Sequence, residues 1–294
     1  MLYSAWKPRK GIIVVCVILV MSLSGILFTL TEIQCLTMRK PSEDENESAQ
    51  FVGHRYDNLE SFRSKIPSDA ELDKMSDTDV EDLYWSYVNT IQVLCQKIVR
   101  VGNIEDGGKE VCMDEPFFPK PPCLVYSFGI GYHWDFDEDA ARMFGCEVFC
   151  FDPSMRDKGE TYVYADNITF YMFGLGSRNE ILENQWEMRT LEQIRRDLNH
   201  MEKTISILKI DIEGSEWTSI PQMVQSGTLH FVKQMQIELH GHGRKHDLKV
   251  LRMLNQDGFK IFMRERNLNC KYSRTGHFRH RTSCMEVSMI RITS

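Results

Sequence analysis

The sequence predicts an α/β domain with a mostly parallel, twisted sheet and helices on both faces, preceded by a membrane-spanning helix. Three observations predict this. Short apolar or β-branched runs alternate with helical stretches beyond about residue 112, glycines and carboxylates follow several of those runs, and a long uncharged segment lies near the N-terminus. The 294 residues carry 42 acidic and 35 basic side chains, a net charge of −7. This balance argues against a nucleic-acid partner, because neutralised phosphates supply most of that affinity.

The N-terminal segment Gly11–Leu30 contains no charged residue. At about 1.5 Å per residue it is long enough to cross a hydrocarbon core of about 30 Å. A cleaved signal peptide is the alternative, but no small-x-small cleavage site follows Leu30. Basic residues precede the segment, which favours a cytoplasmic N-terminus. We therefore expect a cytoplasmic tail at 1–10, a signal-anchor at 11–30, and a type II single-pass protein whose remainder is luminal or extracellular, in the Golgi, the ER or at the cell surface.

Cysteines and glycosylation sequons agree with that orientation. Sequons occur at Asn46 and Asn167, and seven cysteines lie beyond the juxtamembrane Cys35. The pairs predicted first as disulfides are Cys112 with Cys123 and Cys270 with Cys284, whereas Cys146 and Cys150 are predicted to be buried strand residues. Zinc binding is the other interpretation of these cysteines, but the sequence contains no C-x-x-C pair.

The chain beyond the membrane divides into three parts. Residues 31–76 are polar and acidic and predict a solvated stalk. Residues 77–111 predict an amphipathic helix that begins with Asp77 or Thr78 as its cap and runs to Ile98. Residues 112–294 form the main domain. Its expected strands are 123–128, 147–151, 168–173, 205–210, 232–239, 260–265 and 286–292, and its expected helices are 138–144, 190–202, 220–225 and 247–257.

Residues of unusual chemistry follow four of these strands, where ligands bind in open α/β sheets. Gly129 and Gly131 follow the first strand, and Asp152 follows the second at a distance suited to ribose hydroxyls. The dipeptide Gly174-Leu175 follows the third strand, although an ordinary turn would also explain its glycine. Asp211, Glu213 and Glu216 follow the fourth, where helix capping explains the glutamates better than it explains Asp211.

These motifs resemble the methyltransferase-like domain family of the methyltransferase-like protein 24 type, which is related to the FkbM methyltransferases. The matching stretches, in order, are VYSFGIG at 125–131, FDE at 136–138, FDPS at 151–154, FGLGS at 173–177, LKIDIEGSEW at 208–217 and QIELH at 236–240. The resemblance covers about 180 residues. It implies a Rossmann-like fold that binds S-adenosylmethionine and methylates a hydroxyl group.

The resemblance also implies roles for individual residues. Gly129 and Gly131 would face the methionine part of the cofactor, Asp152 its ribose, and Gly174-Leu175 its adenine, with Asp211 near the transferred methyl group. Two positions depart from the commoner methyltransferase pattern. Ser127 stands where an acidic residue often precedes the first glycine, and His133 replaces a frequent third glycine. Asp135 or Asp137 would then have to supply the acid that binds the cofactor's ammonium group.

Methylation of an alcohol requires a base that removes the hydroxyl proton as the new bond forms. The candidates are Asp211 and His240, with Glu213 and Glu238 orienting them. In a metal-assisted alternative, Asp211, Glu213, His240 and His242 are suitable ligand types. The acceptor is a glycan, a lipid, a protein side chain or a small metabolite, and the sequence does not choose among them. A catalytically inactive binding or scaffolding module is the alternative function, since fold does not guarantee activity. A nicotinamide dehydrogenase is disfavoured because the G-x-G-x-x-G spacing is missing.

Overall fold

The computed structural model describes residues 13–15, 36–38, 65–104, 106–241, 243–271 and 281–292. The chain divides into two units, residues 1–59 and 60–294. In the first unit, the described residues form two strands, β1 (Ile13–Val15) and β2 (Leu36–Met38), which pair antiparallel. Residues 13–15 belong to the predicted membrane helix 11–30 and are in a strand instead, while the rest of that segment and the sequon at Asn46 lie outside the described residues. Within the described part of the chain, no helix combines the length and the apolar character that a membrane crossing requires.

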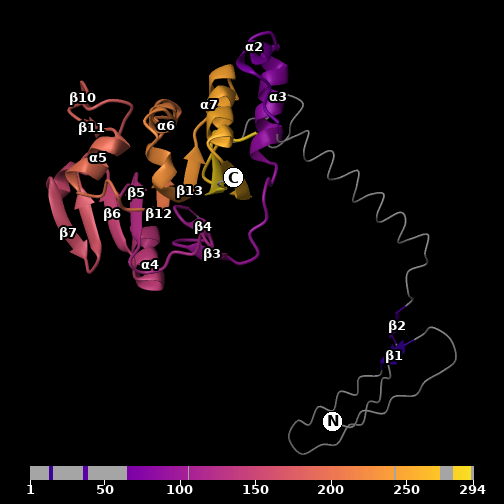
Figure 1. Ribbon diagram of the computed structural model, residues 1–294, viewed down its shortest axis with the longest axis horizontal. Helices are drawn as coiled ribbons and strands as arrows, with labels where there is room; N and C mark the ends of the chain where they lie inside the picture. The colour runs from indigo at the N-terminus through magenta and orange to yellow at the C-terminus, as the bar shows by residue number, and fades with distance from the viewer. Residues whose placement is uncertain are drawn as a thin grey trace, which may run out of the picture. The chain divides into compact units, whose positions relative to one another are not determined.

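The second unit contains an eight-stranded sheet (Figure 1) in the order β14-β15-β13-β12-β5-β6-β8-β7. The bounds of its strands are β5 Leu124–Phe128, β6 Glu147–Phe151, β7 Thr161–Ala165, β8 Ile168–Tyr171, β12 Ile205–Ile210, β13 Val232–Leu239, β14 Phe259–Glu265 and β15 Met285–Arg291. The five central strands from β13 to β8 run parallel, while β7, β15 and β14 are joined by antiparallel pairing. The predicted α/β class with a mostly parallel sheet is confirmed, and β6, β12 and β13 have the predicted bounds.

Helices cover the two faces of the sheet unequally. One face carries α3 (Asp77–Val88), α5 (Leu191–Asp197), α6 (Glu216–Gln225) and α7 (Lys245–Gln256), and the other carries α4 (Asp135–Phe144) with a hairpin of β3 (Ile98–Val101) and β4 (Lys109–Cys112). Figure 1 shows these two layers on opposite sides of the strands. The remaining elements are α2 Asp69–Leu72, η1 Arg156–Lys158, β9 Gly174–Leu175, β10 Glu180–Ile181, β11 Glu187–Arg189 and η2 Thr228–Phe231. Apolar layers on both faces explain why β5 and β12 are buried along their whole length.

The N-terminal part of this unit differs from its prediction. Helix α3 ends at Val88 instead of continuing to Ile98, because the N–H groups of Gln92 and Val93 donate to the carbonyl of Ile261 on the sheet edge. Its cap is Ser76, whose hydroxyl accepts from the N–H of Asp79. The chain then follows the sheet edge and enters the hairpin β3–β4, which was not predicted. The folded unit also starts before Asp77, since Ile66 and Leu72 in the predicted stalk belong to the main apolar core.

The disulfides confirm one predicted pairing and correct the other. Cys270 bonds to Cys284 as predicted, and Cys150 is buried and free. The predicted Cys112–Cys123 bond is wrong. Cys112, the last residue of β4, bonds to Cys95, which precedes β3, and Cys123 bonds to Cys146. The second bond follows from strand register. Cys123 and Cys146 directly precede β5 and β6, which are adjacent parallel strands, so their Cα atoms lie 4.8 Å apart.

Candidate functional site

The site lies where the strand order reverses. From β5 the chain moves outward through β6 and β8, then returns to add β12 and β13 on the other side of β5. The loops that follow β5 and β12 therefore leave the sheet side by side and open a crevice at its carboxyl edge, the usual ligand position in doubly wound sheets. The backbone N–H of Asp211 donates to the carbonyl of Phe128 at 3.0 Å, so the two loops are in contact at their origin.

Gly129 is required by that contact. Its φ of +79° lies in the left-handed region, and a Cβ atom built on it would stand 1.6 Å from the carbonyl oxygen of Asp211. No side chain fits there. Gly131 also has a positive φ, +56°, but its nearest heavy atom would be 3.9 Å from such a Cβ. Gly129 thus permits the two loops to approach, and Gly131 leaves the turn open towards the crevice.

Two buried charged side chains hold this glycine loop from opposite sides. Asp152, at the end of β6, accepts from the N–H groups of Ile130 and Gly131 at 2.9 and 2.8 Å through one oxygen. Its other oxygen accepts from the N–H and hydroxyl of Ser154. Lys209 of β12 donates to the carbonyl of Gly129 at 2.8 Å. The structure therefore places Asp152 as an anchor of the loop, a role that the sequence did not predict, while its ribose contact stays a prediction.

A cavity of about 690 Å³ occupies the crevice, within the range usual for small-molecule sites. Nine of the predicted site residues line it: Gly129, Gly131, Asp152, Gly174, Leu175, Asp211, Glu213, Glu238 and His240. Ser127 and Asp135 do not. Ser127 is buried in β5, and Asp135 is exposed at the start of α4. Asp137 is buried beside Ser127, Cys150 and Lys209; burial raises its pKa. Ser127, Asp135 and Asp137 therefore do not line the cavity, and the structure does not place any of them where it could bind the ammonium group of the cofactor.

The two ends of the cavity differ in chemistry. The end beside the glycine loop carries the apolar side chains Phe151, Pro153, Leu175, Trp186 and Met188. Gly174 brings the backbone of β9 against them, because a Cβ there would stand 2.9 Å from the Met188 side chain. The other end is lined by Asp106, Glu238, His240, Asn267, Asn269, Cys270, Lys271 and Ser283. Asp211 lies between the two ends, directly after β12.

Asp211 and Glu238 form a hydrogen-bonded carboxyl pair. Burial opposes the ionisation of both, but Lys209 and Lys109 lower the pKa of Asp211. Burial, Asp211 and Glu286 raise the pKa of Glu238 to about 8. At neutral pH the pair therefore holds one negative charge and one proton, as expected when two like charges meet in a site of low polarity. A pair of this kind is suited to exchanging a proton with a bound hydroxyl group.

A buried ion pair lies beneath these carboxyls. Lys109 of β4 bonds to Glu286 of β15, and both side chains are nearly inaccessible to solvent. Burial lowers the pKa of Lys109, but Glu286, Asp211 and Glu238 raise it further, so Lys109 stays charged. The unpredicted hairpin thus supplies a cation to the site. Nothing in its local sequence indicates this, because β4 and β15 are 177 residues apart at this contact.

His240 lies among three glutamates. Its Nδ1 is 3.3 Å from Glu216, and its Nε2 is 3.4 Å from Glu213 and 3.9 Å from Glu238. Burial disfavours the imidazolium, yet hydrogen bonding and charge from Glu216, with Glu238 and Glu213, raise the pKa of His240 to about 9. His240 is therefore a cation at neutral pH. Glu216, predicted as a helix cap, is buried and accepts from the N–H groups of His240 and Gly214, so it ties the β12 and β13 loops together.

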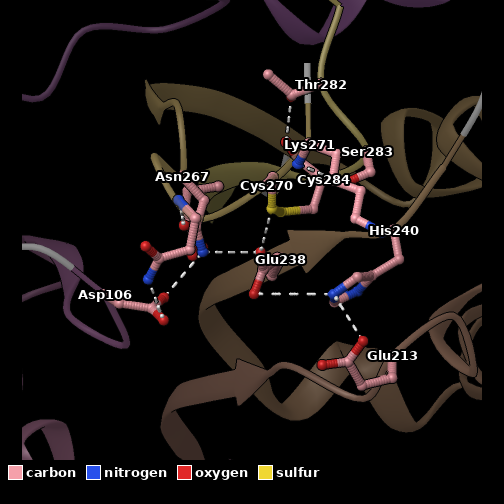
Figure 2. Close-up of a disulfide and its surroundings, with 12 residues drawn as sticks. Asp106, Glu213, Glu238, His240, Asn267, Cys270, Lys271, Thr282, Ser283 and Cys284 are labelled. Carbon is pink, nitrogen blue, oxygen red and sulfur yellow. Dashed lines mark hydrogen bonds and ion pairs between the residues drawn. A yellow bond between two sulfur atoms is a disulfide. The ribbon is translucent and has the colours of Figure 1, made fainter. Parts of the chain in front are cut away.

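The wall opposite the glycine loop joins segments distant in sequence. Asn267 donates to both Asp106 and Glu238, at 2.8 and 3.0 Å, and Asn269 donates to Asp106 at 2.9 Å. The sulfur of Cys270 lies 3.5 Å from Glu238. Figure 2 shows Glu238 between Asn267 on one side and His240 on the other, with the Cys270–Cys284 disulfide beside it. We call Asp106, Asn267, Asn269, Cys270, Lys271 and Ser283 the polar wall; sequence reasoning missed all of its site contacts.

Metal ligation has one candidate among the described residues that is free of disulfide sulfur. Asp211, Glu213 and His240 each bring one ligand atom within 4.8 Å of the others. His242, the fourth residue of the predicted metal-assisted alternative, lies outside the described residues. The high pKa of His240 means that a metal ion would have to displace its proton. The distances between the three ligand atoms are compatible with a metal ion, at the cost of that proton.

Comparisons with known proteins identify the family of the chain. A family model described as a methyltransferase domain matches residues 56–291. Probable methyltransferase-like protein 24 of Rattus norvegicus is 24% identical over 174 residues, covering 54% of this chain and 47% of that protein. The protein of the same name from Homo sapiens is 22% identical over 210 residues, covering 62% of this chain and 56% of the relative. The chain thus spans about half the length of these relatives.

Solved structures also align over part of the chain. One of them, the Methanococcus jannaschii fibrillarin pre-rRNA processing protein, is 10% identical and gives a TM-score of 0.35, covering 60% of this chain and 69% of that one. The fold is therefore defined by the strand order and register given above. The family match covers most of the chain, including every strand around the cavity. Because the match extends over residues 56–291, the chain belongs to the methyltransferase domain family.

Proposed function

We propose that this chain is an S-adenosylmethionine-dependent methyltransferase that methylates a hydroxyl oxygen. One observation carries the proposal: the loops after β5, β6 and β12 converge on a single cavity, with a tightly held glycine turn at one end and an ionised carboxylate at its centre. When bound, S-adenosylmethionine supplies an electrophilic methyl group on a sulfonium. The negative charge of Asp211 favours a cation at that position.

The residues at the apolar end suit the nucleoside part of this cofactor. Leu175, Trp186 and Met188 provide apolar surface for a base, and the glycine turn lets a ligand approach the backbone. Asp152 lines the same end, but its oxygens already accept four hydrogen bonds from the chain. We therefore propose that Asp152 contributes mainly by holding the glycine loop in its binding conformation.

The carboxyl pair suits the removal of the hydroxyl proton. Glu238 has a pKa of about 8, close to working pH, and its ionised form is a stronger base than Asp211. His240, the other candidate base, has a pKa of about 9, so at neutral pH a smaller fraction of it is free of its proton than of Glu238. We propose that the Asp211–Glu238 pair accepts the proton and that His240, held by Glu216, positions Glu238. This changes the role of Glu238 from orienting Asp211 to sharing the proton with it as a member of the basic pair.

The variants Asp211→Asn and Glu238→Gln test this proposal. Calorimetric titration with S-adenosylhomocysteine reports cofactor binding, and transfer of a labelled methyl group from S-adenosylmethionine reports turnover. We expect binding to persist in Glu238→Gln and turnover to fall by about 10²–10⁴-fold, the usual contribution of a general base. Glu180→Gln, on the exposed strand β10, is the matched control. Unchanged turnover in both site variants contradicts the assignment, and absence of S-adenosylhomocysteine binding by the wild type contradicts the proposed function.

We also propose that the protein is a type II membrane protein with this domain in an oxidising compartment. The support is the uncharged segment 11–30, three disulfides, and the sequon asparagine Asn167, which is exposed in the turn between β7 and β8. Treatment with an N-glycosidase should increase the mobility of protein made in a secretory cell, and Asn167→Gln should remove part of that shift. No shift in the wild type contradicts the luminal placement.

A further inference from the structure

The chemistry of the acceptor end of the cavity points to a class of acceptor. Beyond the carboxyl pair, the residues of the polar wall present amides, a carboxylate, an ammonium group and a hydroxyl. Phenyl, indole and large aliphatic side chains line the cavity at the glycine-loop end, not in this wall. This holds for the described residues. The two ends of one cavity therefore offer opposite environments, one suited to a flat apolar ring and one to a ligand rich in hydrogen-bonding groups.

An apolar acceptor fits this wall poorly. An acyl chain or an unsubstituted aromatic ring would displace water from Asn269, Lys271 and Asp106 without returning a hydrogen bond. These three residues are exposed to solvent, and each polar group that a ligand buries without a hydrogen bond costs about 1–3 kcal/mol. A polyhydroxyl ligand avoids the loss, because each of its hydroxyl groups donates and accepts. The wall supplies partners of both kinds: Asp106 accepts, Lys271 donates, and Ser283 does both.

The wall is also held rigidly, as a selective site must be. Asn267 and Asn269 clamp Asp106 to the loop after β14, and the Cys270–Cys284 bond joins that loop to the start of β15. The N–H of Lys271 donates to the hydroxyl of Ser283 at 3.1 Å, and the N–H of Ser283 donates to the carbonyl of Lys271 at 3.0 Å. These two hydrogen bonds hold the wall's last two members as a pair. The Asp106 and Asn267 side chains and the Ser283 hydroxyl are fixed in this way and lose little entropy on binding, whereas Lys271 is held through its backbone and its side chain is exposed.

We propose that the acceptor is a hydroxyl group of a carbohydrate, bound by the polar wall with the reacting oxygen facing Asp211 and Glu238. The inference rests on the proposed function and names its acceptor class. In the balanced step, the acceptor oxygen gains the methyl group, the carbon–sulfur bond of the donor breaks, and the hydroxyl proton passes to the carboxyl pair. The products are a methyl ether and S-adenosylhomocysteine.

The experiment compares acceptor classes with the full chain and S-adenosylmethionine carrying a radiolabelled methyl group. The carbohydrate arm contains the methyl glycosides of galactose, glucose, mannose and xylose, and a second arm contains N-glycans released from glycoproteins. The apolar arm contains 1-octanol and catechol. Titration with S-adenosylhomocysteine is performed on the same preparation. Expected is labelled methyl ether in the carbohydrate arm or the released glycans, and none in the apolar arm.

The outcomes separate the two proposals. Label only in released glycans supports the inference and assigns the acceptor to an oligosaccharide, whereas label in simple glycosides assigns it to a monosaccharide unit. Label in 1-octanol or catechol without label in sugars overturns the carbohydrate inference. Binding of S-adenosylhomocysteine without label in any arm also overturns it, while leaving cofactor binding intact. Absence of that binding overturns the proposed function on which the inference rests.

A pair of variants then tests whether the polar wall makes the contact. Lys271→Met should raise the KM for the labelled sugar about tenfold, the effect of one lost hydrogen bond to a charged group, with an unchanged Kd for S-adenosylhomocysteine. Lys120→Met is the control, since Lys120 is exposed and pairs with Glu115 outside this cavity. An unchanged KM in Lys271→Met, or an equal change in Lys120→Met, contradicts the role of the wall.

Discussion

The two ends of the cavity are built by different means. The glycine-loop end consists of residues that directly follow neighbouring parallel strands: Gly129 after β5, Asp152 after β6 and Asp211 after β12. The polar wall joins Asp106, before β4, to Asn267, after β14, across 161 residues. The first end needs only the sheet to form, because parallel strands bring their carboxyl ends together. The second needs the hairpin and the antiparallel edge of the sheet to dock correctly.

This difference predicts that substitutions at the two ends impair different properties of the protein. Damage to the glycine-loop end should weaken cofactor binding and the fold together, because the loop contacts the central strands. Damage to the polar wall should change acceptor recognition while cofactor binding persists. Two sets of variants test this separation, the one with the larger expected effect first, and a pH experiment then tests the proton held by Glu238.

Gly129→Ala should have the largest effect. The new Cβ would meet the carbonyl of Asp211 at 1.6 Å, so β5 and β12 must separate or the loop must refold. We expect a loss of at least about 3 kcal/mol of unfolding free energy, as for other severe clashes and strained positions, and no measurable binding of S-adenosylhomocysteine. Urea denaturation and calorimetry measure the two quantities. The control is Gly159→Ala, which has a similar φ of +84° but no atom within 4 Å of the added Cβ. A mild effect of Gly129→Ala would contradict this account of the loop.

Removal of the Cys270–Cys284 disulfide should have the next largest effect. The double variant Cys270→Ser, Cys284→Ser should lose about 2–4 kcal/mol of unfolding free energy and should raise the acceptor KM, with an unchanged Kd for S-adenosylhomocysteine. The matched control is Cys123→Ser, Cys146→Ser, which opens a disulfide at the opposite, amino end of the strands. It should lose comparable stability and keep the acceptor KM. Equal KM changes in the two double variants would remove the distinction between the two ends.

A smaller effect is expected from pH. Burial, Asp211 and Glu286 raise the pKa of Glu238 from 4.5 to about 8, so the folded protein binds a proton that the unfolded chain releases. The resulting stability is complete below pH 4.5 and is lost as the pH rises through 8. Each unit of pKa shift corresponds to about 1.4 kcal/mol, and about 1 kcal/mol changes Tm by roughly 2–4 °C at this size.

Melting temperatures at pH 6 and pH 9 measure this effect. In Glu238→Gln, the fall in Tm between these two pH values should be several degrees smaller than in the wild type. In the control Glu180→Gln, the fall in Tm should equal that of the wild type. His240, whose pKa is raised to about 9, contributes a fall of the same sign, and the part of it that comes from Glu216 and Glu213 should remain in Glu238→Gln. An identical fall in the wild type and Glu238→Gln would show that Glu238 does not hold the proton.

The sequence predicted the sheet better than it predicted the N-terminal region. Runs such as 205–210 are mostly apolar and are bounded by polar residues. The start and end of β12 could therefore be predicted from the sequence. Helix α3 was predicted too long because apolar residues continue at helical spacing beyond Asn89. There the chain instead hydrogen-bonds to the edge of the sheet, where the N–H groups of Gln92 and Val93 donate to Ile261. Local periodicity contains no information about an edge that forms from residues far along the chain.

The amino-acid sequence by itself determined the strand-following residues of the site, because period, turn chemistry and strand polarity are local properties. Gly129, Asp152 and Asp211 were identifiable for that reason from their positions along the chain. Only the tertiary structure decided their protonation and their partners. The proton on Glu238, the charge on His240 and the contact of Lys109 with Glu286 all depend on burial and on neighbours brought from distant segments. Electrostatic energies in a protein interior depend on the distances between charged groups and on how far these groups are excluded from solvent. Both are set only when the chain folds.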